Sequence, residues 1–369
     1  MTPLSRIVHL SSVHSALDHR IFHKEARYAA RSGYDVAIVA KHSVSETRDG
    51  VRIVALPARR SRLRRMMLAP WSVLKAAMRE RADIYQFHDP ELIPVGLLLK
   101  LAGKKVVYDI HEMTALQIGV KPWIPRPLRR PLASMFAAIE RFAVGRFDGV
   151  TVPQIQMQKH YAPYARRVAL TRNFVDVADI PEPLPWCERP NILYAGGLSK
   201  ERGMLNMVRA MPYVRDGHRL NLVGRCHPAL LNEARALAGW AKVDYTPEVP
   251  FDQIGSAYRR AALGLILYEN SGQYHMAQAV KLFEFLAWGM PVVMPNFGEW
   301  TGFNEHFQCG INVETSDPHA VAAAINTLLD DPTLSDRLSE NGRKLVSRQF
   351  SWDVEAPNLT RLYQEILSC

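Results

Sequence analysis

This sequence of 369 residues has few cysteines, no long hydrophobic run and no N-terminal pattern typical of a signal peptide. Its four cysteines are scattered with no CxxC pair, so neither a zinc site nor a disulfide framework is indicated, and a reducing compartment is expected. The longest apolar stretch, residues 92–99, contains Pro94 and is far shorter than the roughly 20 residues of a spanning helix. No basic region followed by a long apolar run opens the sequence, so we expect no signal peptide.

Acidic residues are also scarce in the first half of the chain. Residues 1–175 contain 29 Lys and Arg against 13 Asp and Glu, whereas residues 176–369 contain 17 against 23. Such asymmetry indicates an anionic partner for the first half, either nucleic acid or an anionic membrane surface. Because no aromatic platform or recognition helix accompanies the charge, we expect no nucleic-acid partner.

Strand-like and helix-like segments alternate along the whole chain. Runs such as YDVAIVAKH and DIYQFHD in the first half, and NILYAGGL and MPVVMPN in the second, are separated by segments of helical periodicity. This alternation predicts an α/β fold of parallel sheets with helices on both faces. Four prolines between residues 181 and 190 exclude helix and central strand, so we place an interdomain linker there.

The alternation and the linker predict two Rossmann-like doubly wound domains, residues 1–178 and 190–350, facing a ligand cleft at the carboxyl ends of their strands. Residues 351–369 show the pattern of an amphipathic helix. Its apolar face would consist of Leu359, Leu362, Tyr363 and Ile366. We expect this C-terminal helix to dock for burial by returning to the N-terminal domain.

Lys281 and Glu284 are the charged residues of the otherwise apolar run AVKLFEFLAWGMPVV. A helix from Ala277 to Trp288, ended by Gly289, would place both on one face. They could simply pair with each other at the surface. Alternatively, at a helix start whose free amides favour anions, Lys281 would meet a phosphate and Glu284 would accept hydrogen bonds from ribose hydroxyls.

The run KLFEFLAWGMPVV resembles the KLFEYxAxGxPVV segment of nucleotide-sugar-dependent glycosyltransferases with the two-Rossmann GT-B fold, family 4-like and of the bacterial surface or exopolysaccharide type. The resemblance implies that Lys281 contacts the donor diphosphate and Glu284 the ribose, with Leu282 in the same donor-binding segment. The run NILYAGGLSKERG resembles the glycine-rich turn of the family, which admits a diphosphate closely. The run LNLVGRC resembles another segment of the family. Together the two runs imply further donor contacts from Gly196, Gly197, Arg202 and Arg225.

The first half carries the resemblance too. The run LDHRIFHKEARYAARSGYDVAIVAK is similar to the family segment DxRIFxKExxxLAxxGYxV, and DIYQFHDPELIPVGLLLK and VVYDIHE also match. Loops after three strands would meet at one edge of the sheet. The catalytic residues expected there are His111, Asp18 and Glu112, with the histidine implied to contact the transferred sugar. The residues expected on the acceptor side are Arg20, His88, Asp89 and Glu91.

Two positions depart from the family pattern. Many members carry a glutamate eight residues before the position of Glu284, where this chain has Met276. Many also carry arginine in the glycine-rich turn, where this chain has Gly197. The resemblance therefore assigns neither the donor sugar nor the full set of diphosphate contacts.

The resemblance implies transfer of a sugar from a nucleotide diphosphate sugar, with a UDP-sugar favoured over a GDP-sugar, to a saccharide acceptor in bacterial surface polysaccharide synthesis. The resemblance also implies that the anomeric configuration is retained. We expect no metal or cofactor, because Lys281, Arg202 and a helix N-terminus can stabilise the leaving diphosphate. The alternatives are an inverting enzyme, with Asp89, Glu91 or Glu112 as general base, and a nucleotide-sugar 2-epimerase.

Two basic segments of the first half also contain Trp, Met and Leu. The runs ARRSRLRRMMLAPW and KPWIPRPLRRPLASMF suit an anionic membrane surface, with a solvated basic face as the alternative. The cations are Arg59, Arg60, Arg62, Arg64, Arg65, Lys121, Arg126, Arg129 and Arg130. We therefore expect a lipid-linked acceptor and a cytoplasmic protein that is peripheral on the inner face of the cytoplasmic membrane.

Overall fold

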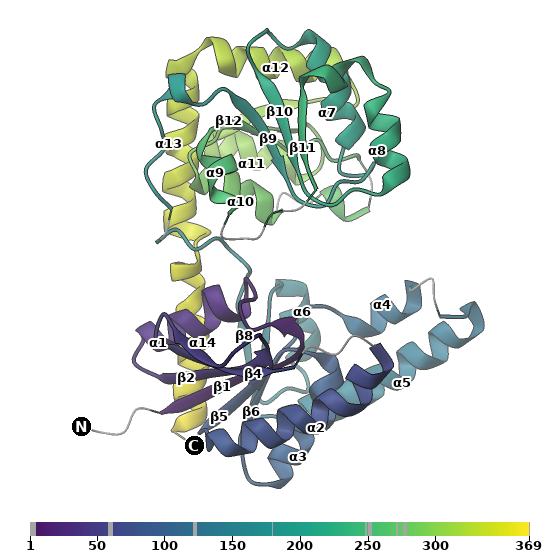
Figure 1. Cartoon of the computed structure of the whole chain (residues 1–369), viewed down its shortest axis with the longest axis vertical. Coiled ribbons are helices and arrows are strands. Elements are labelled where there is room, and N and C mark those ends of the chain that lie inside the picture. The colour runs from purple at the N-terminus through teal and green to yellow at the C-terminus, as the bar shows by residue number, and fades with distance from the viewer. Residues whose placement is uncertain are drawn as a thin grey trace. The chain divides into compact units, whose positions relative to one another are not determined.

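The structure is a computed structural model that describes residues 5–57, 62–120, 124–178, 180–247, 249, 253–270, 272–275 and 279–368. The chain divides into two compact units (Figure 1). Unit 1 comprises Met1–Asn173 and Glu355–Cys369, and unit 2 comprises Phe174–Val354. The chain therefore passes between the units twice. The predicted ligand cleft between the domains stays a prediction.

Unit 1 is built on an eight-stranded sheet. Its strands, in spatial order, are β3 (Glu46–Arg48), β4 (Val51–Leu56), β2 (Asp35–Lys41), β1 (Arg6–Ser15), β5 (Ile84–Phe87), β6 (Lys105–Asp109), β7 (Gly149–Val152) and β8 (Val168–Leu170). Strand β3 pairs antiparallel with β4, and the other neighbours pair in parallel. The chain starts in the middle of the sheet and winds outwards in both directions, which is the doubly wound order predicted from the sequence.

Helices cover both faces of this sheet because alternate strand residues are apolar on opposite sides. Val8 and Val106 belong to one buried cluster, and their neighbours Ile7 and Val107 belong to another. The first face carries α2 (Arg62–Glu80), α3 (Ile93–Leu101), α5 (Arg126–Val144) and α6 (Ile155–Tyr161), and the second carries η1 (Ile21–Ala26), α1 (Arg27–Arg31) and α14 (Trp352–Leu367). Two further elements are η2 (Pro90–Leu92) and α4 (Thr114–Val120).

Unit 2 repeats the architecture with a six-stranded parallel sheet. Its strands, in spatial order, are β11 (Val243–Thr246), β10 (Arg219–Val223), β9 (Asn191–Ala195), β12 (Ala261–Leu265), β13 (Val292–Pro295) and β14 (Gly310–Val313). Its helices are η3 (Trp186–Glu188), α7 (Met204–Ala210), η4 (Met211–Tyr213), α8 (Pro228–Arg235), η5 (Ala238–Lys242), α9 (Gly255–Arg259), η6 (Gly272–His275), α10 (Val280–Ala287), α11 (Glu299–Phe307), α12 (Pro318–Asp330) and α13 (Pro332–Gln349). Six parallel strands in this order form a doubly wound sheet, as predicted.

Helix α10 is shorter than the sequence predicts. It starts at Val280 instead of Ala277, because Ala279 already has an extended backbone. Its last residue is Ala287, one before the predicted Trp288. Gly289 follows as predicted, and its φ of +69° allows Met290 to donate its amide to Phe285 across the helix end. Lys281 consequently lies in the first helical turn.

The proline-rich segment predicted as a linker packs on unit 2. Arg343 of α13 donates two hydrogen bonds to Glu182, and Arg189 donates one to the carbonyl of Gly289. With α13, this segment lines a cavity of about 600 Å³. The segment is therefore part of the unit 2 surface.

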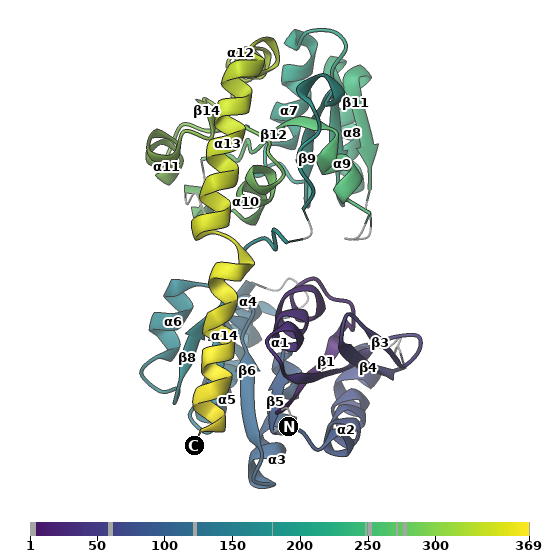
Figure 2. The same ribbon diagram turned by 90° about the vertical axis from the view of Figure 1, so that its left-hand side faces the viewer.

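Helix α14 lies over the sheet of unit 1 (Figure 2). All four apolar residues predicted for its inner face are buried, with at most 3% exposure. The amino group of Lys105 donates to the carbonyl of Ile366 and so satisfies the last turn. Within the described ranges, no helix is long and apolar enough to cross a membrane.

Candidate active site

Asp109 is the centre of a polar cluster at the carboxyl ends of β1, β5 and β6, which are neighbours in the sheet. Its Oδ1 atom accepts hydrogen bonds from Thr151 (2.7 Å) and Arg20 (2.8 Å), and its Oδ2 atom lies 2.9 Å from Nδ1 of His88. Complete burial opposes the charge of Asp109, but Arg20, His111 and His88 together outweigh burial and hold the pKa of this carboxyl well below its usual value. Asp109 is therefore a buried anion.

His111 extends this cluster towards solvent. Its Nε2 atom lies 2.6 Å from Oδ2 of Asp109, and about a fifth of its side chain is exposed. Because the ionised carboxylate only accepts, Nε2 carries the proton and donates. In the neutral ring, Nδ1 then holds the lone pair, which is free to act as an acceptor. The neighbouring Glu112 side chain is exposed to solvent.

Asp18 has a positioning role in this arrangement. Its Oδ1 atom accepts the backbone amides of Arg20 and Ile21, and its Oδ2 atom lies 3.0 Å from Nδ1 of His14. This hydrogen bond raises the pKa of His14. The ring of His14 lies 5.4 Å from that of His111. Asp18, which was predicted to be catalytic, therefore holds a second histidine next to His111.

Three of the four residues predicted for the acceptor side are buried. Arg20, His88 and Asp89 are 6%, 2% and 2% exposed. The carboxylate of Asp89 accepts the amides of Ser12 and Val13, and Arg20 also binds Thr171. These three side chains hold the loops in place with polar atoms that face the interior of the unit, and their role on the acceptor side stays a prediction. Glu91 remains partly exposed and accepts a hydrogen bond from Ser12 at 2.8 Å.

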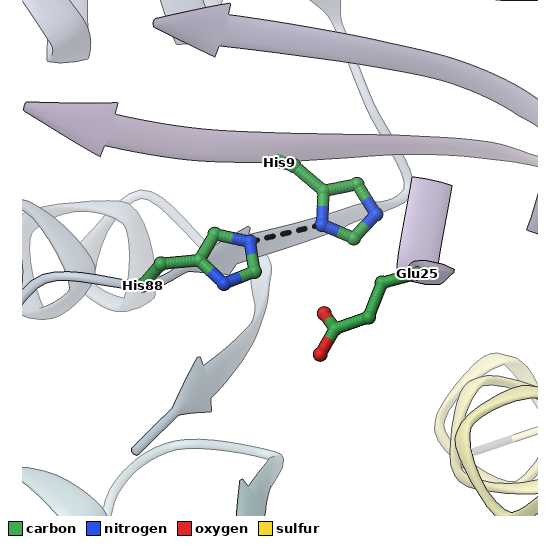
Figure 3. A group of neighbouring side chains, drawn as sticks. All are labelled: His9, Glu25 and His88. Carbon is green, nitrogen blue, oxygen red and sulfur yellow. Dashed lines mark hydrogen bonds between the residues drawn. The ribbon is translucent and has the colours of Figure 1, made fainter. Parts of the chain in front are cut away.

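A second buried group is formed by His9, Glu25 and His88 (Figure 3), and it shares His88 with the set of His88, Asp109 and His111. Nδ1 of His9 is 3.0 Å from Nε2 of His88. Since His88 gives its Nδ1 proton to Asp109, His9 is the donor in this pair. Burial, reinforced by His88, lowers the pKa of His9 well below its usual value. Burial, reinforced by Asp109, raises the pKa of Glu25 well above its usual value.

Two sets of side chains have the spacing of metal ligands among the described residues: His9, Glu25 and His88, and His88, Asp109 and His111. The guanidinium of Arg20 lies 3.0 Å from a carboxylate oxygen of Glu25 and 2.8 Å from one of Asp109. A metal ion in either set would face this cation at short range. The cluster is thus arranged as a hydrogen-bond network around one buried ion pair.

In unit 2, a turn without side chains follows β9. Gly196 has a φ of +150°, and Gly224, at the end of β10, packs so closely that a Cβ there would lie 1.9 Å from the carbonyl oxygen of Gly196. A Cβ at Gly196 would in turn lie 3.4 Å from Cε of Lys281. The structure therefore brings the glycine-rich turn and the start of α10 together, as the sequence predicts.

Lys281 and Glu284 are paired in this structure. Nζ of Lys281 lies 2.6 Å from Oε2 of Glu284, and the hydroxyl of Tyr258 donates to the same oxygen at 2.5 Å. Tyr258 is almost fully buried on α9, and burial, reinforced by Glu284, raises its pKa well above the usual value. The hydroxyl therefore keeps its proton and fixes the carboxylate against the sheet.

The guanidinium of Arg202 fills the space beside Gly197. It donates to the carbonyl of Gly197 at 3.1 Å, and a Cβ on Gly197 would lie 2.9 Å from its Nη1 atom. A side chain at position 197 would displace the end of the Arg202 side chain from this place. Arg202 thus occupies the space that the departure from the family pattern at Gly197 leaves open. Met276, the other departure, lies outside the described residues.

Two predicted donor residues have different surroundings. Leu282 is fully buried in the core of unit 2, and its amide donates to Ala279, so its side chain cannot contact a ligand. This corrects the prediction for Leu282. Arg225 is exposed, and its carbonyl accepts the amide of Leu198 just after the glycine-rich turn. Its backbone therefore lies beside the turn, and its predicted contact with the donor stays a prediction.

Sequence reasoning missed Asp109, His14 and Tyr258. Asp109 lies in the run VVYDIHE, where an acid that ends an apolar strand two residues before a histidine was a usable signal. His14 lies four residues before Asp18, which was a weaker signal. Nothing in the sequence distinguishes Tyr258, because it meets Glu284 only through the packing of α9 against α10.

Comparison with known proteins agrees with this geometry. Residues 19–179 match the family described as Glycosyltransferase Family 4, and residues 201–360 match the family described as Glycosyl transferase-like. The chain is 23% identical over 295 residues to glycogen synthase of Mycobacterium tuberculosis. The aligned residues make up 77% of this chain and 69% of the relative.

Solved structures agree as well. Sucrose-phosphate synthase from Thermosynechococcus elongatus superposes with a TM-score of 0.71 at 19% identity, over 99% of both chains. HepE of Anabaena, solved in complex with UDP and glucose, superposes with a TM-score of 0.67 at 13% identity, over 98% of this chain and 100% of that chain. Both show the same fold. The two family matches together span most of the chain, which belongs to the family 4 type glycosyltransferases with the GT-B fold.

Proposed function

We propose that this glycosyltransferase moves a sugar from a nucleoside diphosphate sugar, with UDP-sugar favoured over GDP-sugar, to a saccharide acceptor. Unit 2 holds the donor and unit 1 the acceptor. The observation that carries the proposal is the approach of Lys281, in the first turn of α10, to the turn at Gly196. A diphosphate group binds well where a cation lies beside a glycine backbone, because the absence of Cβ atoms allows close approach.

The Lys281–Glu284 pair explains how the donor would bind. A diphosphate would attract the ammonium of Lys281 away from Glu284 and leave that carboxylate available to ribose hydroxyls. Tyr258 keeps the carboxylate in place during this exchange, since its hydroxyl donates to Glu284 independently of Lys281. Arg202 supplies a second cation next to the turn. The two cations stabilise the leaving diphosphate in this scheme without a metal ion.

The ligands of a similar solved structure support a UDP-sugar as the donor. HepE of Anabaena was solved with UDP and with UDP-glucose. For the acceptor, the support is the positive charge of the first half, which suits a lipid-linked saccharide at the inner face of the cytoplasmic membrane, as in surface polysaccharide synthesis. Three of the cations predicted for that surface, Arg59, Arg60 and Lys121, lie outside the described residues, and side chains of α2 are described only from Leu68 onwards.

The proposed reaction retains the anomeric configuration, and Nδ1 of His111 is the group placed to accept a hydrogen bond from the transferred sugar. An inverting reaction would need a general base. Asp89 does not suit that role because it is buried and accepts several hydrogen bonds, so Glu91 and Glu112 are the alternatives. A nucleotide-sugar 2-epimerase would change the donor without an acceptor, and analysis of products separates it from a transferase.

Thermal shifts with UDP, GDP, ADP and dTDP test the donor class. A ligand that binds only the folded protein at 100 times its Kd adds about 2.7 kcal/mol of stability. We expect a shift with UDP that disappears in Lys281→Ala. The matched control is Lys344→Ala, which removes a lysine from another helical Lys–Glu pair, with Glu340 at 2.6 Å, and should keep the shift. Absence of a shift with all four nucleotides, from folded protein, would overturn the proposal.

A further inference from the structure

The face of the unit 1 sheet beneath α14 carries polar side chains within an apolar layer. Gln86 of β5 is paired in register with Val107 of β6, and Asp109 lies two residues further along β6, so all three share this face. Helix α14 covers it (Figure 2) and contributes Tyr363. Gln86 and Tyr363 are fully buried. Their polar atoms therefore need hydrogen-bond partners inside the unit.

Tyr363 and Gln86 bind each other and then Glu25. The hydroxyl of Tyr363 donates to Oε1 of Gln86, and Nε2 of Gln86 donates to Oε2 of Glu25 at 2.7 Å. An amide has one accepting end and one donating end. The hydroxyl of Tyr363 therefore fixes which end of Gln86 faces the carboxyl of Glu25.

Arg20 connects Glu25 to the candidate active site. Its Nε atom lies 3.0 Å from Oε1 of Glu25 and donates to Oδ2 of Asp109 at 3.0 Å. The same Oδ2 atom lies 2.6 Å from Nε2 of His111. One N–H group of Arg20 is thus shared between the carboxyl of Glu25 and the oxygen that orients the histidine. The contacts form a continuous path inside unit 1 from α14 to His111.

We propose that Tyr363 is a positioning residue for His111. The proposal rests on the proposed function, in which His111 accepts a hydrogen bond from the transferred sugar. Without the hydroxyl, Oε1 of Gln86 is left buried without this donor, which is a costly state, and the amide turns to find another. The carboxyl of Glu25 then shifts against Arg20, and the imidazole is no longer held in one orientation.

Steady-state kinetics of Tyr363→Phe in the full chain tests the proposal, with release of UDP from UDP-glucose as the activity. Phenylalanine keeps the ring, which packs edge-on against Tyr34 with 5.8 Å between the ring centres, so the variant should fold. We expect kcat to fall about tenfold, because a small displacement of a group at the reacting centre is costly. The KM for the donor, which unit 2 binds, should stay within about twofold. Gln86→Met breaks the path at the next contact and should have the same effect.

A double-mutant cycle with His111→Gln shows whether the loss passes through the histidine. Once His111 has been replaced, we expect Tyr363→Phe to have no further effect on kcat. Equal fold losses in the two backgrounds would overturn the proposal. The matched control is Tyr161→Phe, which removes another buried hydroxyl, one that donates to Glu140 at 2.9 Å in the cluster on the other face of the sheet. It should keep the kcat of the wild type.

A measurement without substrate separates this proposal from the proposed function. The nitrogen NMR resonance of Nε2 of His111, assigned by its absence from His111→Gln, reports the hydrogen bond to Asp109. It should shift or broaden in Tyr363→Phe and stay unchanged in Tyr161→Phe. An unchanged resonance in Tyr363→Phe would overturn the proposal whether or not the protein transfers sugar. The donor assignment fails on a different observation, the absence of any nucleotide-induced thermal shift.

Discussion

Nε2 of His111 lies 2.6 Å from Oδ2 of Asp109, so a buried anion holds a partly exposed imidazole in one orientation. The same carboxylate binds Arg20, which is itself buried. The orientation of the histidine therefore depends on an ion pair in the interior of unit 1, at the ends of strands that are adjacent in the sheet.

Replacing His111 should reduce activity without unfolding the protein. In His111→Gln we expect sugar transfer to fall by about 10²–10³, the usual effect of removing one preorganised hydrogen-bonding group. The melting temperature should change little, since the ring is partly exposed. The measurement is the transfer rate alongside a thermal melt. Glu112→Gln tests the inverting alternative, because a loss of several orders of magnitude there would indicate an inverting reaction with Glu112 as the general base.

Asp109→Asn should instead act on stability. It leaves the buried guanidinium of Arg20 without its anion, and removing one partner of a buried ion pair costs about 3–5 kcal/mol. Denaturant unfolding near neutral pH measures this loss. A variant that is as stable as the wild type would mean that Arg20 finds its counter-charge elsewhere.

The proton on Glu25 predicts a pH-dependent effect of Glu25→Gln. The pKa of Glu25 is raised in the folded state, mainly by burial, so its contribution to stability is full below its usual value of 4.5 and decreases as the pH rises towards the folded pKa. The amide has no such dependence. We therefore expect the stability of Glu25→Gln relative to the wild type to increase between pH 5 and 7.5.

Thermal melts of both proteins across this pH range measure the difference. Asp109→Asn provides the comparison, because the pKa of Asp109 is depressed: its contribution is present above the usual value of 3.8 and is lost only as the pH falls further. The loss of stability caused by Asp109→Asn should therefore be constant over the same pH range. A Glu25→Gln effect that does not change with pH over this range would mean that the pKa of Glu25 is not raised in the folded protein.

Gly224→Ala should be more harmful than Gly217→Ala, although both glycines have a positive φ. A Cβ there would meet the carbonyl of Gly196 at 1.9 Å, whereas Gly217, with a φ of +89°, has no neighbour within 4 Å of its Cβ position. Both variants carry the backbone strain of about 1–2 kcal/mol. The measurement is the free energy of unfolding together with the UDP-induced shift. Equal losses in the two variants would mean that the glycine-rich turn adapts easily.

The sequence was sufficient for the fold because strands and helices alternate with clear periodicity, and both sheets have the predicted doubly wound order. The strands Glu46–Arg48 and Val168–Leu170 were not predicted, because each has three residues and carries little pattern. In the site, Lys281, Glu284 and the glycine-rich turn could be found from their motif. Tyr258 could not, because its contact with Glu284 depends on how two helices pack.

The roles of Arg20 and His88 were harder to infer for a related reason. A charged residue in a loop after a strand is expected to face solvent, and only the coordinates show that Asp109 draws both side chains inwards. Motifs identify which residues matter to a family. Whether each one touches the ligand or holds another residue depends on burial, which a single sequence does not specify.

The path of the chain has a consequence for how the protein is made. Helix α14 covers one face of the sheet in unit 1, yet its residues are translated after those of unit 2. During synthesis the apolar residues that α14 will cover, among them Ile7, Ile38 and Val107, stay exposed while unit 2 folds. The sheet of unit 1, although translated before unit 2, is therefore covered only after unit 2 has been translated.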